Sequence, residues 1–283
     1  MASISNYMSS PVITVDILDS VEQAVSLMEE NCIGGLPVLE DGKLCGMITS
    51  RDARRSHMNR IIADAMSKNP VFVYTNTSLW DAINLMEEKQ VERLPVFESG
   101  KLVGIVTKKS LLAEAGKHED TLTGLKKAPY LRYMAENILS QGKELTVIFF
   151  DINGFGKINK KYGHVRGDIC LKIIGRLLSE RTENGVYFPG RYAGDEFMVI
   201  TTEDTERSKE WAIKIVNEVA VLTKEFGVPI NIVAGVARGG RDGTCIGSYF
   251  AIAVDNLINK ASLASTISKE EGIQVTCIKE ELK

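Results

Sequence analysis

Hydrophobic and polar positions in roughly the first 115 residues follow one plan twice. At an offset of 58 residues, Met8-Ser9 corresponds to Met66-Ser67, "LMEE" at 27 recurs at 85, "LPV" at 36 recurs at 94, and "GKL" at 42 recurs at 100. So many matches at one offset indicate an internal repeat. The segment is therefore expected to contain two copies of one supersecondary unit.

Each copy is predicted to hold an amphipathic helix followed by a two-stranded hairpin. Ser20, with Gln23 completing a capping box, and Ser78 stand in the capping positions before the helices. The apolar stripes, spaced i, i+3, i+4 and i+7, are Val21, Ala24, Val25 and Met28, and Leu79, Ala82, Ile83 and Met86. The hairpins are "LPVLE" with "LCGMIT" and "LPVFE" with "LVGIVT", turning at Asp41-Gly42 and Ser99-Gly100. One unit has too small a core to stand well alone, so the two are expected to pack as a pair.

The pattern changes in the second half. "ELTVIFFDINGF" is a continuous apolar run that ends in Asp151, which predicts a strand buried on both faces with the acid at its exposed end. The next segment, 159–180, predicts one helix with Ile169, Ile173 and Leu177 on its apolar stripe. "VYFPGRYAGDEFMVIT" predicts a hairpin that turns near Gly194-Asp195. An amphipathic helix at 208–226 and a buried strand at 228–237 follow. This order predicts an α+β domain, with helices on one face of a sheet that contains antiparallel strands.

Three carboxylates would meet if the strand ending at Asp151 neighbours the hairpin, because Asp195 and Glu196 sit at its tip. Such a group repels itself unless a positive charge is present. Mg²⁺, or Mn²⁺ in its place, suits hard oxygen ligands, especially when a nucleoside triphosphate supplies the remaining ones. The alternative is an acidic hairpin tip that is simply solvated.

The bulk properties fit a soluble, cytoplasmic protein of about two domains. The 283 residues carry a net charge of −3, which argues against nucleic-acid binding. No apolar run approaches the roughly 18 residues of a membrane span, and the N-terminus lacks the order of a signal peptide. The scattered cysteines favour reduced thiols over disulfides or a zinc site; they are Cys32, Cys45, Cys170, Cys245 and Cys277.

The repeat plan, with "GMITSRD" and "GIVTKKS" at its two ends, resembles a tandem pair of CBS domains, each a βαββα-type unit. The resemblance implies that an adenine nucleotide (AMP, ADP, ATP or a related ligand) binds in a cleft between the repeats. Thr49 and Asp52 would contact phosphate and ribose, with Arg51 beside them. Copy two keeps Thr107 but has Ser110 in place of the acid, so its cleft is expected to be weaker or empty. The alternative is that Thr49 and Asp52 merely cap the helix that starts there.

The ordered set "DTLTGL", "FFDINGFGKINKKYGHVRGD", "RYAGDEF" and "INIVAGVA" resembles the GGDEF domain of the diguanylate cyclase family. The expected domains are residues 1–58 and 59–117 for the CBS repeats and 118–283 for a palm-like cyclase domain with helices flanking its sheet. The resemblance implies a homodimer in which each subunit binds GTP, and in which two GTP molecules are joined into cyclic di-GMP.

Residue roles follow from the resemblance position by position. Asp151, the Ile152 carbonyl and Asp195 would hold Mg²⁺, and Glu196 would act with Asp195 beside the attacking hydroxyl. Asn159 and Asp168 would read guanine, since a carboxylate accepts from N1 and N2 hydrogens that adenine does not present. The alternative for these last two is helix capping.

Several positions depart from the family pattern. Ala193 replaces the first glycine of the signature, and Gly156, Ser262 and Thr266 stand where the family has cations. Lys157, Lys260 and Lys269 remain as possible replacements, and their spacing does not choose among them. The product-inhibition motif is missing, since Asn184 and Tyr187 occupy its places, so no feedback site is expected.

Three functions remain open on the sequence. The first is a diguanylate cyclase regulated by an adenine nucleotide at the CBS pair, through the short connection at 110–125. The second is a degenerate module that binds GTP or a partner as a sensor or scaffold. The third, a purely structural dimerisation protein, leaves Asp151, Asp195, Asn159 and Asp168 unexplained.

Overall fold

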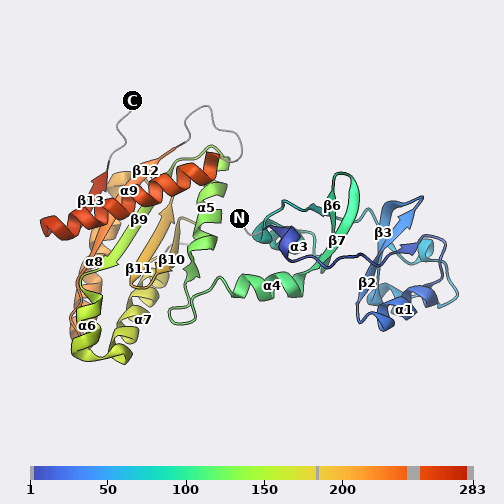
Figure 1. Cartoon of the computed structure of the whole chain (residues 1–283), viewed down its shortest axis with the longest axis horizontal. Coiled ribbons are helices and arrows are strands. Elements are labelled where there is room, and N and C mark those ends of the chain that lie inside the picture. The colour runs from blue at the N-terminus through green and yellow to red at the C-terminus, as the bar shows by residue number, and fades with distance from the viewer. Residues whose placement is uncertain (1–2, 183–184, 241–248, 279–283) are drawn as a thin grey trace. The chain divides into compact units, whose positions relative to one another are not determined.

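The computed structural model describes residues 3–182, 185–240 and 249–278 (Figure 1). The chain divides into two compact units, Met1–Gly116 and Lys117–Lys283, and each is taken by itself. Cys245 and Asn184 lie outside the described residues. No helix in the described ranges is both long enough and apolar enough to cross a membrane.

The first unit confirms the repeat. Its first copy contains β1 (Val15–Asp16), α1 (Val21–Glu30), β2 (Gly35–Glu40), β3 (Lys43–Thr49) and α2 (Ser50–Arg54), and its second contains β5 (Val73–Tyr74), α3 (Leu79–Glu88), β6 (Arg93–Glu98), β7 (Lys101–Thr107) and α4 (Lys108–Gly116). Ser20 and Ser78 cap α1 and α3 as predicted. The turn residues Asp41-Gly42 and Ser99-Gly100 all have positive φ, the conformation that a two-residue hairpin favours.

The two repeats complete each other's sheets. The start of copy two forms β4 (Ser67–Lys68), which pairs with β3 of copy one, and Ser9, at the start of copy one, forms a bridge with Ile105 of β7. Glycines in β3 and β7 make room for the methionine that precedes each pairing segment. A Cβ at Gly104 would lie 2.4 Å from the Met8 sulfur, and one at Gly46 would lie 2.4 Å from the Met66 sulfur. This exchange explains why Met-Ser and the glycine recur together, and it holds the pair as one body.

The second unit is built on a six-stranded mixed sheet with the order β13-β12-β9-β11-β10-β8. The strands are β8 (Lys126–Lys127), β9 (Leu145–Ile152), β10 (Tyr187–Ala193), β11 (Glu196–Thr201), β12 (Ile232–Gly239) and β13 (Val275–Ile278). The helices are α5 (Ala128–Ser140), α6 (Phe155–Tyr162), α7 (His164–Glu180), α8 (Thr205–Glu225) and α9 (Tyr249–Glu271). The predicted α+β class, hairpin and buried strands are confirmed.

Helices cover both faces of this sheet, so the prediction of helices on one face is wrong (Figure 1). Ile148, Phe150 and Ile152 of β9 pack into the core beside α7 and α8. Val147 and Phe149 of the same strand pack into the core beside α5 and α9. Alternate residues of β9 therefore enter two different cores, which is why its sequence is continuously apolar and shows no polar face.

The helix predicted over 159–180 is two helices. Gly163 separates α6 from α7 with φ of 85° and ψ of 153°, which no helical residue adopts. The buried stripe of α7 also lies one residue beyond the predicted one, since Ile169 and Ile173 are only half-buried. Its buried apolar residues are Cys170, Leu171, Ile174, Leu177 and Leu178.

Helix α9 lies unusually close to β12. A Cβ added at Gly235 would lie 2.0 Å from the carbonyl oxygen of Ala261 and 2.3 Å from the backbone nitrogen of Ser265. The α9 residues that face the sheet here are all small, namely Ala261, Ala264, Ser265 and Ser268. The Ser268 hydroxyl donates to the Ala234 carbonyl at 3.1 Å and lies 2.7 Å from the Thr276 hydroxyl, which fixes the helix along the strands.

Substitution of Gly235 by alanine is expected to destabilise the second unit by about 1–3 kcal/mol, because the added carbon meets backbone atoms that cannot move without displacing α9. Urea unfolding followed by Trp211 fluorescence, in a Trp80→Phe background, measures this free energy. Gly156→Ala is the matched control, since nothing lies within 4 Å of a Cβ there and the position is helical. Equal stability of Gly235→Ala and the control would contradict the close packing of α9.

Candidate functional site

Strand pairing brings the three predicted carboxylates together. Asp151, the second-last residue of β9, lies directly opposite Glu196, the first residue of β11. Asp195 lies in the turn just before it. Alternation along β9 and β11 places Asp151 and Glu196 on the face that Phe149 and Met198 share with α9. Asp151, Asp195 and Glu196 are called the carboxylate corner below.

A cation from α9 lies at this corner. The Lys269 ammonium is 2.6 Å from Oδ1 of Asp151, with side-chain exposures of 32% and 19% respectively. Burial, and then the charges of Asp151 and Asp195, raise the pKa of the Glu196 carboxyl, while Lys269 opposes that rise. The field at the corner is therefore negative even with one ammonium present, which favours a further cation.

The turn that carries Asp195 is held by Arg191. Its guanidinium donates from Nε and Nη2 to the Gly194 carbonyl at 2.8 and 2.6 Å, and from Nη1 to Asp120 at 2.9 Å. Burial opposes ionisation of Asp120, but hydrogen bonds from Thr123 and Arg191 outweigh it, so the pKa of this carboxyl is lowered. Gly194 takes the left-handed conformation, with φ of 40°, whereas Ala193, the last residue of β10, does not have a positive φ, so alanine is accommodated at that position.

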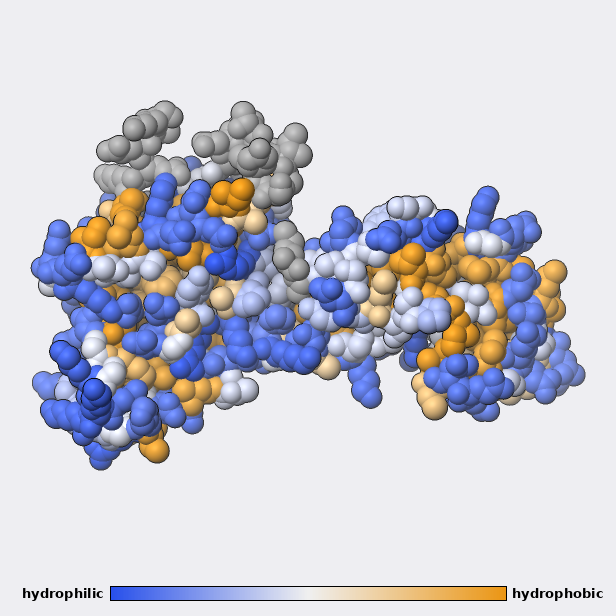
Figure 2. All heavy atoms as spheres, viewed as in Figure 1, coloured by the Kyte–Doolittle hydropathy of each residue, from blue (hydrophilic) through white to orange (hydrophobic). Residues whose placement is uncertain are grey.

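Asn159 and Asp168, the predicted guanine readers, lie on neighbouring helices. Asn159 is on α6, and its side-chain oxygen packs against Gly167 of α7, because a Cβ added at Gly167 would lie 1.9 Å from that oxygen. Gly167 directly precedes Asp168, which is exposed. That oxygen is buried and has no hydrogen-bond partner within the described chain. Asn159 is within α6 and Asp168 within α7, so neither caps a helix. The surface over α6 and α7 is mostly hydrophilic in Figure 2.

The oxygen chemistry of the corner fits a divalent metal. No group of three or more His, Cys, Asp or Glu side chains in the described ranges is arranged to hold an ion by itself. Mg²⁺ does not need one, since it is commonly held by one or two carboxylates together with substrate phosphates and water. Asp151 and Asp195 supply that number, and Ile152, whose carbonyl was predicted as a third ligand, is the last residue of β9.

Ser262 and Thr266, the positions on α9 where the resemblance sets the family's cations, are neutral. The Thr266 hydroxyl donates to the Ser262 carbonyl at 3.2 Å, and so does the hydroxyl of Ser265 at 2.7 Å, so both hydroxyls bond within the helix. Lys269, three residues beyond Thr266, is the lysine that the structure places at the corner. Spacing alone did not distinguish it from Lys157 and Lys260.

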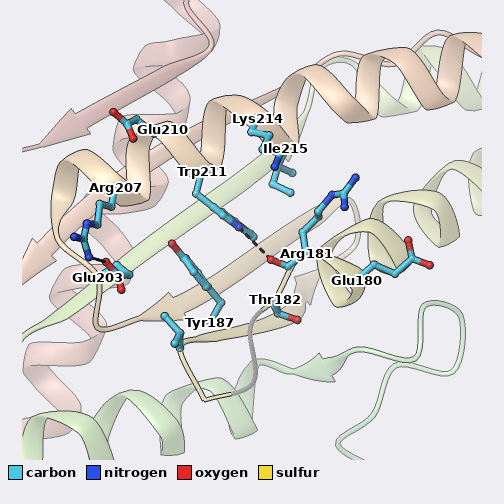
Figure 3. Close-up of a pocket in the computed structure, with 11 residues that line it drawn as sticks. Glu180, Arg181, Thr182, Tyr187, Glu203, Arg207, Glu210, Trp211, Lys214 and Ile215 are labelled. Atoms are coloured by element: carbon cyan, nitrogen blue, oxygen red, sulfur yellow. Dashed lines mark hydrogen bonds and ion pairs between the residues drawn. The ribbon is translucent and has the colours of Figure 1, made fainter.

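Tyr187, at the place of the missing product-inhibition motif, forms part of a pocket wall with Trp211. The two rings stack at 4.7 Å with planes 15° apart, and the Trp211 indole donates to the Arg181 carbonyl at 3.2 Å. Figure 3 shows this pocket of about 570 Å³, in which Arg207 pairs with Glu203 at 3.0 Å. The expected absence of product inhibition stays a prediction.

In the first unit, Thr49 and Asp52 form a complete capping box at the start of α2. The Thr49 hydroxyl donates to Asp52 Oδ2 at 2.6 Å, and the Thr49 amide donates to the same oxygen at 2.9 Å. Arg51 is exposed on the same helix. The capping alternative is therefore observed, and it leaves nucleotide binding at these residues untested.

A cavity of about 310 Å³ lies on the Thr107 side of the pair, where the sequence predicted the weaker cleft. Thr107, Lys109 and Arg93 of copy two and Gly34 and Gly35 of copy one line it, among others. The Arg93 guanidinium packs over Gly34, where an added Cβ would lie 2.4 Å from Nη2. Burial lowers the pKa of Arg93, although an arginine remains charged. The sequence analysis did not single out Arg93. At the offset of 58 it corresponds to Gly35 of copy one, and the repeat pattern does not show that an arginine at this position lines a cavity.

Comparison with known proteins agrees with this architecture. The family model "Diguanylate cyclase, GGDEF domain" matches residues 117–266. The chain belongs to the GGDEF family. The CBS domain model matches residues 4–59 and 62–117, so a CBS pair precedes the GGDEF domain, as the resemblance predicted.

Individual relatives cover one part each. The CBS domain-containing protein YhcV of Bacillus subtilis is 37% identical over 112 residues, which is 38% of this chain and 80% of that protein. Inosine-5′-monophosphate dehydrogenase of Korarchaeum cryptofilum is 41% identical over 102 residues, which is 35% of this chain and only 21% of that enzyme. The solved GGDEF domain of DgcB from Caulobacter crescentus, in complex with c-di-GMP, is 22% identical with a TM-score of 0.48, covering 56% of this chain and 95% of that one.

Removal of the Asp120 carboxylate is expected to loosen the hairpin. Asp120→Asn should lower the free energy of unfolding of the second unit by about 1.5–3 kcal/mol, the range for a hydrogen bond to a charged group. Urea unfolding monitored at Trp211 measures it, with Glu180→Gln, in the exposed pair with Arg176, as the control. Because the pKa of Asp120 is lowered by folding, its contribution is full above about pH 4 and is lost as the pH falls further. A difference from wild type that is unchanged at about pH 3 would contradict this account.

Proposed function

We propose that the second unit is a metal-dependent diguanylate cyclase that condenses two GTP molecules into cyclic di-GMP. The observation that carries the proposal is the register of β9 and β11, which sets Asp151 opposite Glu196 and beside Asp195. Backbone pairing holds these three carboxylates at one point. Apolar or neutral side chains there would stabilise the fold better, so the carboxylates are better explained by a function than by stability.

The chain's own residues have distinct parts in this proposal. Asp151, Asp195 and the Ile152 carbonyl would hold the metal. Glu196, whose pKa is raised, would lie beside the attacking 3′-hydroxyl and is suited to accept its proton. When bound, the metal polarises the α-phosphate and lowers the pKa of the 3′-hydroxyl. Arg191 keeps the turn fixed, so that Asp195 is positioned before substrate arrives.

Guanine is read at the α6–α7 pair. Asp168 accepts from the N1 and N2 hydrogens of the base, and Asn159 presents a side chain whose buried oxygen lacks a partner within the described chain. The reaction joins two nucleotides, so it requires a homodimer in which two such sites face each other.

A second function is favoured by one specific observation. The resemblance sets the family's phosphate-binding cations at positions 262 and 266, where this chain has the neutral residues Ser262 and Thr266. A module that holds GTP without turnover, as a sensor or scaffold, keeps the guanine readers and the carboxylate corner but needs less charge on the phosphates. Turnover decides between the two functions.

The full chain incubated with GTP and Mg²⁺, and then with Mn²⁺, is expected to form cyclic di-GMP, separable by chromatography. Asp195→Ala should abolish the product, whereas Glu206→Ala, which removes an exposed carboxylate on α8, should not. Binding of GTP without product in the presence of either metal would establish the sensor or scaffold function instead. Neither binding nor product would contradict both.

We further propose that the CBS pair binds an adenine nucleotide and thereby regulates the cyclase. Thr49, Asp52 and Arg51 serve one cleft, where Oδ2 of Asp52 makes the capping bonds. Thr107, Lys109 and Arg93 serve the other, where a cavity of nucleotide size contains a half-buried guanidinium. The second cleft has the stronger physical support, because half-buried Arg93 and exposed Lys109 line it and outnumber Glu92, and cations favour anionic ligands.

Arg93→Met is expected to weaken binding of AMP, ADP or ATP about tenfold, the loss of one charge-assisted contact. Calorimetry on the full chain measures it, with exposed Arg60→Met as the matched control. Asp52→Asn reports the other cleft in the same way. Binding that is unchanged in Arg93→Met but weakened in Asp52→Asn would return the site to the Thr49 cleft, and no binding by the wild type would refute the nucleotide.

A further inference from the structure

Positive charge is concentrated on α6 and the first part of α7. Residues 155–176 hold six Lys and Arg residues and one acid, whereas the remainder of residues 120–283 holds 16 Lys and Arg and 20 Asp and Glu. The six are all exposed, namely Lys157, Lys160, Lys161, Arg166, Lys172 and Arg176. Of these six, only Arg176 forms an ion pair with another described residue, Glu180. The other five cations, called the basic surface below, are not neutralised by direct contact with an acid.

Helix stability does not explain these positions. Lys157 is in the first turn of α6 and Arg166 is in the first turn of α7, and neither first turn contains an acid. Backbone dipoles make the N-terminal end of a helix positive, so a cation there is unfavourable. Lys157, Lys160 and Lys161 are spaced i, i+3 and i+4, so their like charges also repel along one face of α6. Lys160 and Lys161 suit the dipole in the last turn of α6, but the dipole does not account for Lys157 or Arg166.

The basic surface lies around the proposed guanine readers. Lys160 directly follows Asn159 on α6, and Arg166 lies two residues before Asp168 on α7. Lys172 lies one turn beyond Asp168, on the same face of α7. A ligand that approaches Asn159 and Asp168 therefore passes through a positive field.

The carboxylate corner has the opposite effect on a nucleoside triphosphate. Burial, and then the negative charges of Asp151 and Asp195, raise the pKa of the Glu196 carboxyl, while Lys269 opposes that rise. A polyanion is repelled at such a negative corner until a metal ion neutralises it. The field of the basic surface has the attractive sign and extends about 10 Å at an ionic strength of about 0.1 M. A triphosphate is therefore attracted first to α6 and α7.

We propose that the basic surface captures the triphosphate of GTP electrostatically and raises the rate at which the nucleotide reaches Asn159 and Asp168. This proposal rests on the GTP binding of the proposed function. Summed surface charge raises the local concentration of an oppositely charged ligand, and the effect falls steeply with ionic strength. The basic surface thus acts in association, and its exposed lysines are not needed to retain the bound nucleotide.

Stopped-flow mixing of the full chain with methylanthraniloyl-labelled GTP and Mg²⁺ tests the capture. The triple variant Lys160→Gln, Lys161→Gln and Lys172→Gln is expected to associate about fivefold more slowly than wild type at low salt, with an unchanged dissociation rate. The difference should disappear at an ionic strength of about 0.5 M, because salt screens the field. Glutamine keeps the helix propensity of lysine, so α6 and α7 should remain folded.

The matched control removes three lysines from α8, as Lys209→Gln, Lys214→Gln and Lys224→Gln, and should leave both rates near the wild-type values. Guanosine with the same label, which has no phosphate, should associate equally fast with all three proteins. Equal slowing in the control, unchanged association at low salt, slower association of labelled guanosine, or faster dissociation of GTP would overturn the capture and leave GTP binding intact. Absence of GTP binding by the wild type would overturn the guanine site and the capture together.

Discussion

Burial of β9 on both faces is the constraint on which the second unit depends. Its side chains enter the core beside α7 and α8 and the core beside α5 and α9 in strict alternation. Each large apolar side chain buried in this way contributes about 1.5–3 kcal/mol. A slip of one residue would exchange the two faces at once, so the register is strongly specified. The position of Asp151 opposite Glu196, on the α9 face, is a consequence of that register.

The second determinant is how near α9 comes to the sheet. Small residues on both sides, Gly235 on β12 and Ala261, Ala264 and Ser265 on α9, permit backbone contact. That approach gives Lys269 its reach to Asp151. Lys269, one helical turn beyond Thr266, is the lysine of α9 that pairs with Asp151 at the corner.

The sequence predicted what depends on local pattern. The repeat, the capping serines, the hairpin turn at Gly194 and the two-sided burial of β9 all follow from apolar spacing or turn chemistry, and the structure has them. It did not predict what depends on three-dimensional packing. The break at Gly163 interrupts a segment whose apolar spacing continues through it, and the second helix layer needs knowledge of which strand faces which helix. The selection of Lys269 among three lysines, and the approach of Arg93 to Gly34, are contacts between distant segments that carry no local signal.

The measurement that tests the account most directly is the anomalous scattering of Mn²⁺ in crystals of the full chain grown with GTP. The account predicts an ion bound to Asp151 and Asp195, with guanine against Asn159 and Asp168. An ion bound elsewhere, or GTP bound with no ion at Asp151 and Asp195, would contradict it.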